Sequence, residues 1–182
     1  MRIIAGWLKG RRLKAPDGFG VRPTSDGLRE TLFNVLGPTI DGARVLDAFA
    51  GTGALGLEAL SRGAASLVFV ERDRRAIRVL EENVAACGAS EACAIIRDDF
   101  VGIDARGGLD GAFDLVLLDP PYDLRELDQA VETAAALVGT GGRMVLEHSR
   151  RRASPEAAAR LVRTRVLVAG DSALSFYAAA PA

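Results

Sequence analysis

The chain has 182 residues, 49% of them hydrophobic, and its 23 basic and 24 acidic residues give a formal net charge of −1. A chain of this length is expected to form one domain with a core of its own, and no segment approaches the uninterrupted apolar length of a membrane span. The near-neutral charge argues against a protein that coats nucleic acid indiscriminately.

The N-terminus and the two cysteines bear on the cellular location. The first residues lack the apolar region of a signal peptide. Cys87 and Cys93 fit neither a disulfide framework nor the spacing of metal ligands, so reduced structural thiols are expected. We therefore expect a cytoplasmic protein with no membrane attachment and no metal site.

Basic residues are concentrated in residues 1–24 and 150–165, and each stretch holds six basic residues against one acidic residue. The first stretch suits phosphate contacts, although a solvated surface explains it equally well. For the second stretch we prefer compositional bias, because arginine supplies 21 of the 23 basic residues.

In chain order, the first predicted elements are two short extended segments, residues 2–5 and 11–15, joined by a glycine-containing turn. Asp26 can cap a helix that Gly37-Pro38 stops. The apolar positions of this helix share one face: Leu28, Leu32, Val35 and Leu36.

From Ala43 onward, strands alternate with helices. The predicted strands cover residues 44–47, 66–71, 92–97, 113–118, 143–147, 165–168 and 172–177. The predicted helices cover residues 53–62, 73–87 and 126–138, and a last helix begins at Pro155. This alternation predicts an α/β fold with a parallel sheet covered on both faces. The final two strands are joined too closely for a helical crossover, so we expect them to be antiparallel neighbours.

A glycine motif follows the first of these strands. Residues 51–56 match G-x-G-x-x-G between a predicted strand and a predicted helix, and Glu71 lies 20 residues beyond Gly51, at the end of the next strand. This is the layout of a nucleotide-binding βαβ unit, with the acidic residue on the ribose hydroxyls. Alone, the motif favours a dinucleotide.

Asp47 changes that interpretation. It ends the first strand four residues before Gly51, which places a carboxylate beside the position of a pyrophosphate. S-adenosylmethionine has no phosphate, and its ammonium and sulfonium groups would both be attracted by a carboxylate. Farther along, Asp99 could accept the adenine N6 hydrogen while Phe100 covers the ring. The alternative for Asp98-Asp99 is a turn that caps the loop.

Asp119-Pro120-Pro121-Tyr122 follows the apolar strand over residues 113–118. Two consecutive prolines end the strand abruptly and leave a carboxylate, an exposed carbonyl and an aromatic ring at its carboxyl end. Ligands of open parallel sheets bind at this edge. The group suits a planar base that bears an exocyclic amine, whereas the alternative is a simple turn with Tyr122 packed inward.

With these motifs in place, the chain resembles the bacterial 16S ribosomal RNA guanine-N2 methyltransferase family nearly from end to end. The motifs at residues 47–56 and 119–122 are shared by many amino-methyltransferases and indicate only the class. The matching segments are residues 2–6, 9–11, 22–26, 29–34, 45–64, 119–122 and 170–174, and the N-terminal ones among them indicate the family. Gly27 is a departure, because a basic residue is expected there.

The resemblance implies a Rossmann-like class I methyltransferase with a seven-stranded, mostly parallel sheet and an antiparallel last strand. It also implies a small N-terminal hairpin and helix extension, residues 1–40, before the methyltransferase domain, residues 41–182. The implied donor is S-adenosylmethionine, with S-adenosylhomocysteine as product, and the implied substrate is a guanine of 16S rRNA in the small subunit or an assembly particle.

Three groups of site residues follow from the motifs and the resemblance. The residues expected at the reacting amine are Asp119, Pro120, Pro121 and Tyr122. Those expected at the cofactor are Asp47, Ala50, Gly51, Gly53, Glu71, Arg72, Asp99, Phe100 and Asp119. Those expected to contact RNA near the site are Arg2, Lys9, Arg11, Arg12, Arg22 and Thr24.

Other functions share parts of this pattern. An adenine-N6 or protein-glutamine methyltransferase could carry the same tetrapeptide. An NAD-dependent oxidoreductase would explain the glycine motif but not Asp47 or residues 119–122. A non-catalytic RNA-binding or ribosome assembly factor would not need the tetrapeptide. His148, the only histidine, is expected to be structural or solvent-exposed.

Overall fold

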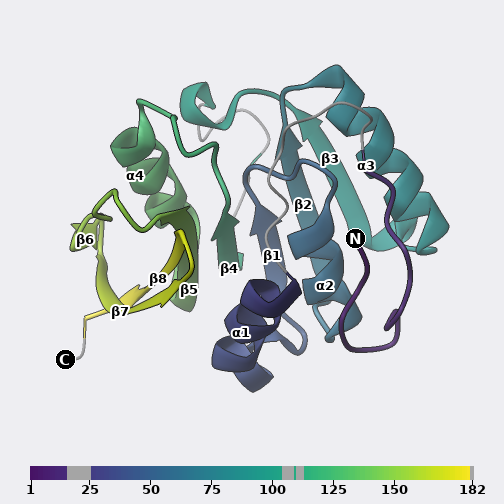
Figure 1. The fold of residues 1–182 in the computed structure, drawn as a ribbon, viewed down its shortest axis with the longest axis horizontal. Coiled ribbons are helices and arrows are strands. Elements are labelled where there is room, and N and C mark those ends of the chain that lie inside the picture. Colours follow the sequence, from purple (N-terminus) through teal and green to yellow (C-terminus); the bar gives the residue numbers. More distant parts are fainter. Residues whose placement is uncertain (16–25, 104–108, 110–112, 181–182) are drawn as a thin grey trace.

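The computed structural model describes residues 1–15, 26–103, 109 and 113–180 (Figure 1). Its centre is an eight-stranded sheet in the order β3-β2-β1-β4-β5-β8-β7-β6. The strands are β1 (Arg44–Asp47), β2 (Ser66–Glu71), β3 (Cys93–Arg97), β4 (Phe113–Leu118), β5 (Val138–Ser149), β6 (Ala157–Ala158), β7 (Leu161–Ala169) and β8 (Ser172–Ala179). The α-helices are α1 (Asp26–Leu36), α2 (Ala54–Ser61), α3 (Arg74–Ala86) and α4 (Leu127–Leu137), and short 3₁₀ helices cover Gly37–Ile40, Ser90–Ala92 and Phe100–Gly102.

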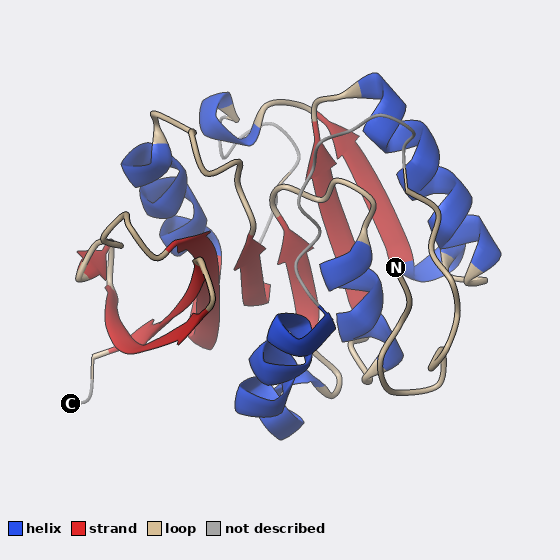
Figure 2. Cartoon of the chain, in the orientation of Figure 1, coloured by secondary structure: helices blue, strands red, loops and turns tan. Residues whose placement is uncertain are grey.

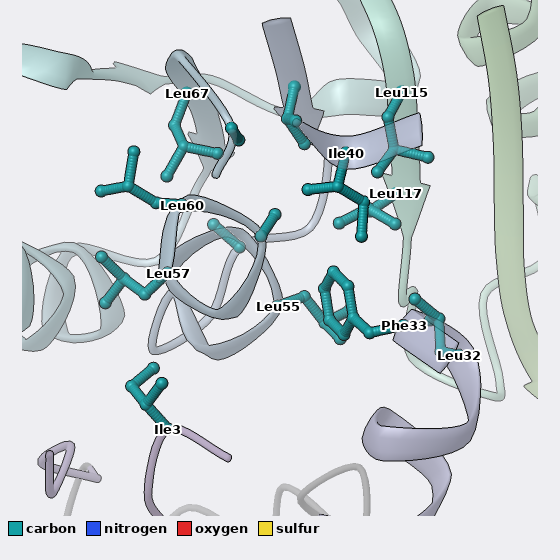
Figure 3. Close-up of a cluster of buried hydrophobic side chains, with 14 of the residues drawn as sticks. Ile3, Leu32, Phe33, Ile40, Leu55, Leu57, Leu60, Leu67, Leu115 and Leu117 are labelled. Atoms are coloured by element: carbon teal, nitrogen blue, oxygen red, sulfur yellow. The ribbon is translucent and has the colours of Figure 1, made fainter. Parts of the chain in front are cut away.

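The sheet is parallel from β3 to β5 and antiparallel beyond. The helices flank it (Figure 2). One hydrophobic cluster joins α1, α2 and α3 to one face of the sheet, and a second joins α4 to the other. Figure 3 shows the first cluster, in which side chains of α1 and α2 meet Leu115 and Leu117 of β4. The expected α/β architecture with helices on both faces is confirmed.

Most element boundaries agree with the sequence-based expectation, because the local signals are strong there. The predicted ranges of β1, β2 and β4 match those in the structure. Asp73 caps α3 as its side chain accepts from the Arg75 and Ala76 amides at 2.8 and 3.0 Å. The final two strands are antiparallel neighbours, as expected.

The C-terminal third differs from the expectation in two places. The helix predicted from Pro155 is wrong: β6 lies there and pairs with β7, which makes eight strands rather than seven. Ala159 has a φ of 47°, which an α-helix cannot accommodate, and the Pro155 carbonyl accepts a hydrogen bond from Tyr177 Oη at 2.8 Å. Long-range contacts therefore override the helix propensity of this alanine-rich stretch. In addition, β5 begins at Val138, directly after α4 and before the predicted start at residue 143.

The N-terminal residues pair as a minimal hairpin. Arg2 and Arg12 form an isolated antiparallel bridge, so the two expected extended segments do meet, without forming regular strands. Ile3 and Leu8 are buried in the same hydrophobic cluster as α1, α2 and the sheet. This segment runs alongside α2 and α3 (Figure 1).

A buried carboxylate fastens the segment to α2. Glu58 is fully buried and accepts hydrogen bonds from the Ile4 amide at 2.7 Å, the Ala5 amide at 3.1 Å and Arg62 Nε at 2.7 Å. Arg29 of α1 is also fully buried, and its guanidinium donates to the Arg2 carbonyl at 2.6 Å. Paired and hydrogen-bonded charges of this kind can be buried without leaving an isolated ion in the core.

Candidate active site

The glycine motif and the Asp119–Tyr122 tetrapeptide lie side by side. β1 and β4 are adjacent parallel strands, and Asp47 at the end of β1 is paired with Leu117, two residues before Asp119. Both loops therefore leave the same carboxyl edge of the sheet, where open α/β folds bind their ligands. This register brings the two motifs found in the sequence to one edge of the sheet.

The glycine motif forms a tight turn into α2. Gly51 and Gly53 have φ values of 52° and 79°, in the left-handed region that favours glycine. A Cβ atom at Gly53 would lie 2.3 Å from the Leu80 side chain, and one at Gly56 would lie 2.3 Å from the Phe69 ring. The motif thus lets the backbone turn and lets α2 pack closely on the sheet. Ala50, also expected at the cofactor, is buried in this turn.

Glu71 at the end of β2 holds the turn from the neighbouring strand. Its Oε2 accepts from the Gly51 amide at 2.8 Å, and its Oε1 accepts from the Arg72 and Asp73 amides at 2.9 and 2.8 Å. One carboxylate thus joins the glycine turn to the start of α3. Contact with ribose hydroxyls stays a prediction for this residue.

Asp47 is buried beneath the glycine turn. Its Oδ2 accepts from the Gly56 amide at 3.0 Å, while its Oδ1 has no hydrogen-bond partner among the described residues. Burial, and then the nearby charge of Glu71, raises the pKa of Asp47 to about 7. A buried carboxylate oxygen without a partner fits a cationic ligand group such as the ammonium of S-adenosylmethionine, whose positive charge would favour the ionised form.

The third strand ends in a second acidic group. Asp99 Oδ2 lies 2.7 Å from an Arg72 guanidinium nitrogen, and this pairing raises the pKa of Arg72. Asp99 also caps the Phe100–Gly102 turn by accepting from the Val101 amide at 3.2 Å, so the capping role considered as an alternative is present. Phe100 is buried and packs edge-on against Phe49 with ring centroids 5.5 Å apart. The structure thus gives Phe100 a core position, and its contact with adenine stays a prediction.

The tetrapeptide loop is anchored through Tyr122. The ring is 37% exposed, so it is not packed inward as the simple-turn alternative required. Its hydroxyl lies 2.6 Å from Ser172 Oγ, the first residue of β8, and donates to Glu147 Oε1 of β5 at 3.4 Å. Glu147 and Ser172 are both buried. Tyr122 is therefore partly exposed while its hydroxyl is held by two strands.

The far side of this loop is held by the second basic stretch. Arg152 donates to the carbonyls of Leu124 and Arg125, just beyond Tyr122. Arg160 donates to the Val138 carbonyl, and Arg163 donates to the Ser154 carbonyl and hydroxyl. These three arginines have structural partners, whereas Arg151 and Arg165 of the same stretch are exposed.

The N-terminal turn within the first basic stretch lies farther from the carboxyl edge than expected. The Trp7 amide donates to the Ser61 carbonyl at 3.0 Å, which places the N-terminal turn at the C-terminal end of α2, whereas the glycine turn is at its start. The expected RNA contacts Lys9, Arg11 and Arg12 are exposed in this turn and the extended segment after it, and Arg2 is exposed but pairs with Asp26 at 3.7 Å. Arg22 and Thr24 lie outside the described residues.

Three buried polar residues of this region are absent from the sequence-based site. Asn83 donates to the carbonyls of Lys14 and Thr52 at 3.1 and 2.9 Å, and so joins the N-terminal segment to the glycine turn. Glu147 and Ser172 bind Tyr122. Ser172 lies in residues 170–174, one of the segments that match the family, and this match was the signal by which the sequence could have indicated it.

The remaining expectations concern residues without a direct role. His148 is structural: it is buried, and its Nε2 lies 2.9 Å from Ser175 Oγ. Cys87 and Cys93 are free cysteines. Within residues 1–15, 26–103, 109 and 113–180, no group of His, Cys, Asp and Glu side chains has an arrangement that could hold a metal ion. None of the helices in these ranges is long and apolar enough to cross a membrane.

Residues 1–178 match the family model described as Conserved hypothetical protein 95. The chain belongs to this family. It is 37% identical over 180 residues to YlbH of Bacillus subtilis, whose name marks it provisionally as an rRNA methyltransferase, and the match covers 97% of this chain and 98% of YlbH. It is 43% identical over 131 residues to Ribosomal RNA small subunit methyltransferase D of Escherichia coli, covering 72% of this chain and 65% of that protein.

A solved structure supports the same assignment. The methyltransferase yhhF of Escherichia coli, so titled provisionally, superimposes with a TM-score of 0.82 at 35% sequence identity, covering 97% of this chain and 96% of that one. The expected family and the Rossmann-like class I methyltransferase fold are both confirmed, with the two-residue β6 as an additional strand.

Proposed function

We propose that this family member methylates the exocyclic N2 amine of a guanine in 16S rRNA, within the small subunit or an assembly particle. The observation that carries the proposal is the register of β1 and β4, because it sets the expected donor site beside the Asp119–Tyr122 loop. The relatives named as small-subunit rRNA methyltransferases support the substrate class. The guanine and its N2 atom come from the family resemblance and the chemistry of the loop.

The proposed donor site comprises the glycine turn and the carboxyl ends of β1, β2 and β3. S-adenosylmethionine would supply a methyl group on a sulfonium and leave as S-adenosylhomocysteine. Asp47 would attract its positive charges, and the glycine turn would let the backbone approach closely. Glu71, Arg72, Asp99 and Phe100 are the residues proposed to line the ribose and adenine positions.

The tetrapeptide would prepare the amine. The lone pair of guanine N2 is delocalised into the ring, so the amine is a poor nucleophile. Asp119 and the Pro120 carbonyl would accept its two hydrogens, which favours a pyramidal nitrogen with its lone pair directed toward the methyl group. The prolines make the acceptors rigid, and positioning of this kind can contribute about 7–11 kcal/mol. The proton of the alkylated amine can leave after transfer, so Asp119 need not be a strong base.

Tyr122 would stack on the guanine through its exposed face. A base–aromatic stack contributes about 1–3 kcal/mol in single-strand binding proteins. A guanine within a helix would have to leave its stack to reach this loop. Lys9, Arg11, Arg12 and the other proposed basic contacts would hold the phosphate backbone without reading sequence.

The test is incubation of the protein with small subunits that lack the modification and with methyl-labelled donor, followed by nucleoside analysis. We expect N2-methylguanosine at one site. Label in N6-methyladenosine or in protein would overturn the proposal in favour of another amino-methyltransferase.

Asp119→Ala should reduce transfer by about 10²-fold or more while S-adenosylhomocysteine still binds, by comparison with the loss of one transition-state hydrogen bond in other enzymes. Asp123→Ala, which removes an exposed carboxylate from the same loop, is the matched control.

A further inference from the structure

Trp7 is the only tryptophan of the chain and is 64% exposed, which is unusual for the largest apolar side chain. It lies in the N-terminal turn, which contacts α2 at Ser61. Its position is not explained by packing, because the neighbouring Leu8 is buried while the indole stays outside.

The indole is nevertheless fixed in place. Its Nε1 donates to the Leu60 carbonyl at 3.2 Å, and the Trp7 amide donates to the Ser61 carbonyl at 3.0 Å. Gly6, with a φ of 78°, lets the turn approach Ser61 so closely that a Cβ atom would lie 1.6 Å from its carbonyl oxygen. An exposed ring held in this way has already lost most of its conformational freedom, so a flat partner can bind it at little further entropic cost.

The surroundings of the ring are basic. Residues 1–15 contain no acidic residue. Lys9 is exposed in the same turn, and Arg11 and Arg12 are exposed in the extended segment that follows it. These three residues form no ion pair among the described residues. Exposed aromatic rings interleaved with cations are the usual surface for single-stranded nucleic acid, because every base offers a flat face beside a phosphate.

We propose that Trp7 stacks on an unpaired base of the RNA substrate, at a second contact separate from the methylated guanine. This inference rests on the proposed function for the identity of the substrate. Helix α2 has eight residues and spans about 12 Å, and Trp7 contacts its C-terminal end whereas the glycine turn lies at its start. One extruded base cannot occupy both places, so Trp7 contacts another nucleotide of the same RNA.

A single ring suits a base better than a lipid surface or an apolar protein partner. Within the described part of the turn, no other large apolar side chain is exposed: Ile3, Leu8 and Leu13 are all buried. Membrane anchoring and protein interfaces draw on larger apolar areas than one indole. Anionic vesicles are therefore included in the test as the competing occupant.

The test uses tryptophan fluorescence, excited at a wavelength that the two tyrosines do not absorb, so that the emission reports Trp7 alone. The probes are a single-stranded RNA 12-mer, a duplex of the same length and vesicles of phosphatidylserine and phosphatidylcholine, with binding measured independently by sedimentation. Saturable quenching by the single strand, and little by the duplex, is expected. RNA binding that leaves the tryptophan emission unchanged would overturn the proposal. A blue shift of the emission on vesicles, without quenching by the single-stranded RNA, would also overturn it.

The variants extend the test to turnover. Trp7→Ala should raise the KM for the RNA substrate about 5- to 160-fold, the change that corresponds to the loss of one stack, with an unchanged KM for the methyl donor. Trp7→Phe, which keeps a ring, should recover part of the loss. Val168→Ala, at a side chain that is 62% exposed on β7, is the matched control.

An unchanged KM in Trp7→Ala would overturn the inference. Wild-type protein without activity on RNA would instead overturn the proposed function, and the quenching titration would still decide the role of Trp7.

Discussion

The Tyr122 hydroxyl lies 2.6 Å from Ser172 Oγ, so the loop after β4 is tied to the first residue of β8, 50 residues farther along the chain. Because Glu147 also accepts from this hydroxyl at 3.4 Å, the orientation of the ring is determined by β5 and β8 as well as by its own loop. The proposed stacking residue is thus positioned by the antiparallel half of the sheet.

This relationship predicts that Tyr122→Phe and Ser172→Ala each reduce the rate of methyl transfer. A single hydrogen bond contributes about 0.5–1.5 kcal/mol net, so a loss of up to roughly tenfold is expected. The double variant should lose no more than Tyr122→Phe alone, because that substitution already removes the bond to Ser172. Single-turnover kinetics measures the effect, and independent, multiplicative losses would contradict the assigned partnership.

The close contact at Gly56 predicts a defect in both folding and ligand binding. In Gly56→Ala the new methyl group meets the Phe69 ring at 2.3 Å, and overpacking of this kind typically costs about 1–3 kcal/mol. Thermal unfolding and titration with S-adenosylhomocysteine measure the two effects. Gly27→Ala is the control, since a Cβ there meets nothing within 4 Å. Equal stability of the two variants would show that α2 can move away from the sheet freely.

The raised pKa of Asp47 predicts a defined pH dependence. The folded protein holds this proton up to about pH 7, whereas the unfolded chain releases it near the ordinary value of 3.8. Between these values the folded state binds more protons, so the contribution of Asp47 to the free energy of unfolding falls as pH rises, and it is constant above the window. Denaturant unfolding at several pH values, with Asp47→Asn subtracted from wild type, measures this contribution. A difference that rises with pH would contradict it.

Ligand binding should show the opposite trend at the same residue. A cationic ligand favours the ionised carboxylate, so affinity for S-adenosylhomocysteine, which retains the ammonium group, should increase from pH 6 to pH 8 with release of a proton. Calorimetry in two buffers of different ionisation enthalpy detects that proton. Asp47→Asn should remove the proton release.

The basic N-terminal turn predicts a salt-dependent contact. Replacement of Arg11 and Arg12 by alanine should weaken RNA binding and make its dependence on salt less steep, because fewer counterions are released. The control replaces Arg151 and Arg165, two exposed arginines of the other basic stretch. The slope of log K against log salt distinguishes the pairs, and an equal change in both would refute a specific role for the turn.

The sequence predicted elements with strong local signals well. β1 and β2 match because short apolar runs end at glycine-rich or charged turns. The stretch at residues 155–159 was mispredicted because its alanines favour a helix, while contacts with β7 and Tyr177 stabilise a strand and a turn. No local pattern carries that information.

In the candidate site, too, contiguous motifs could be predicted and residues with distant partners could not. The glycine turn and the tetrapeptide were found because each is contiguous in sequence. Asn83, Glu147 and Ser172 were missed because each acts on a partner more than 20 residues away. The distance between Trp7 and the glycine turn could not be read from the sequence either, since it depends on which end of α2 the N-terminal segment contacts.

Glu58 makes the N-terminal segment difficult to exchange. Its carboxylate is buried under backbone amides that only residues 4 and 5 provide. A chain that began at residue 6 would keep the charge in the core and lose two of its donors, which is far more costly than trimming an exposed tail. The basic turn cannot therefore be grafted onto another methyltransferase as an independent tag. It would have to be transferred together with α2, which begins directly after the glycine turn of the proposed donor site.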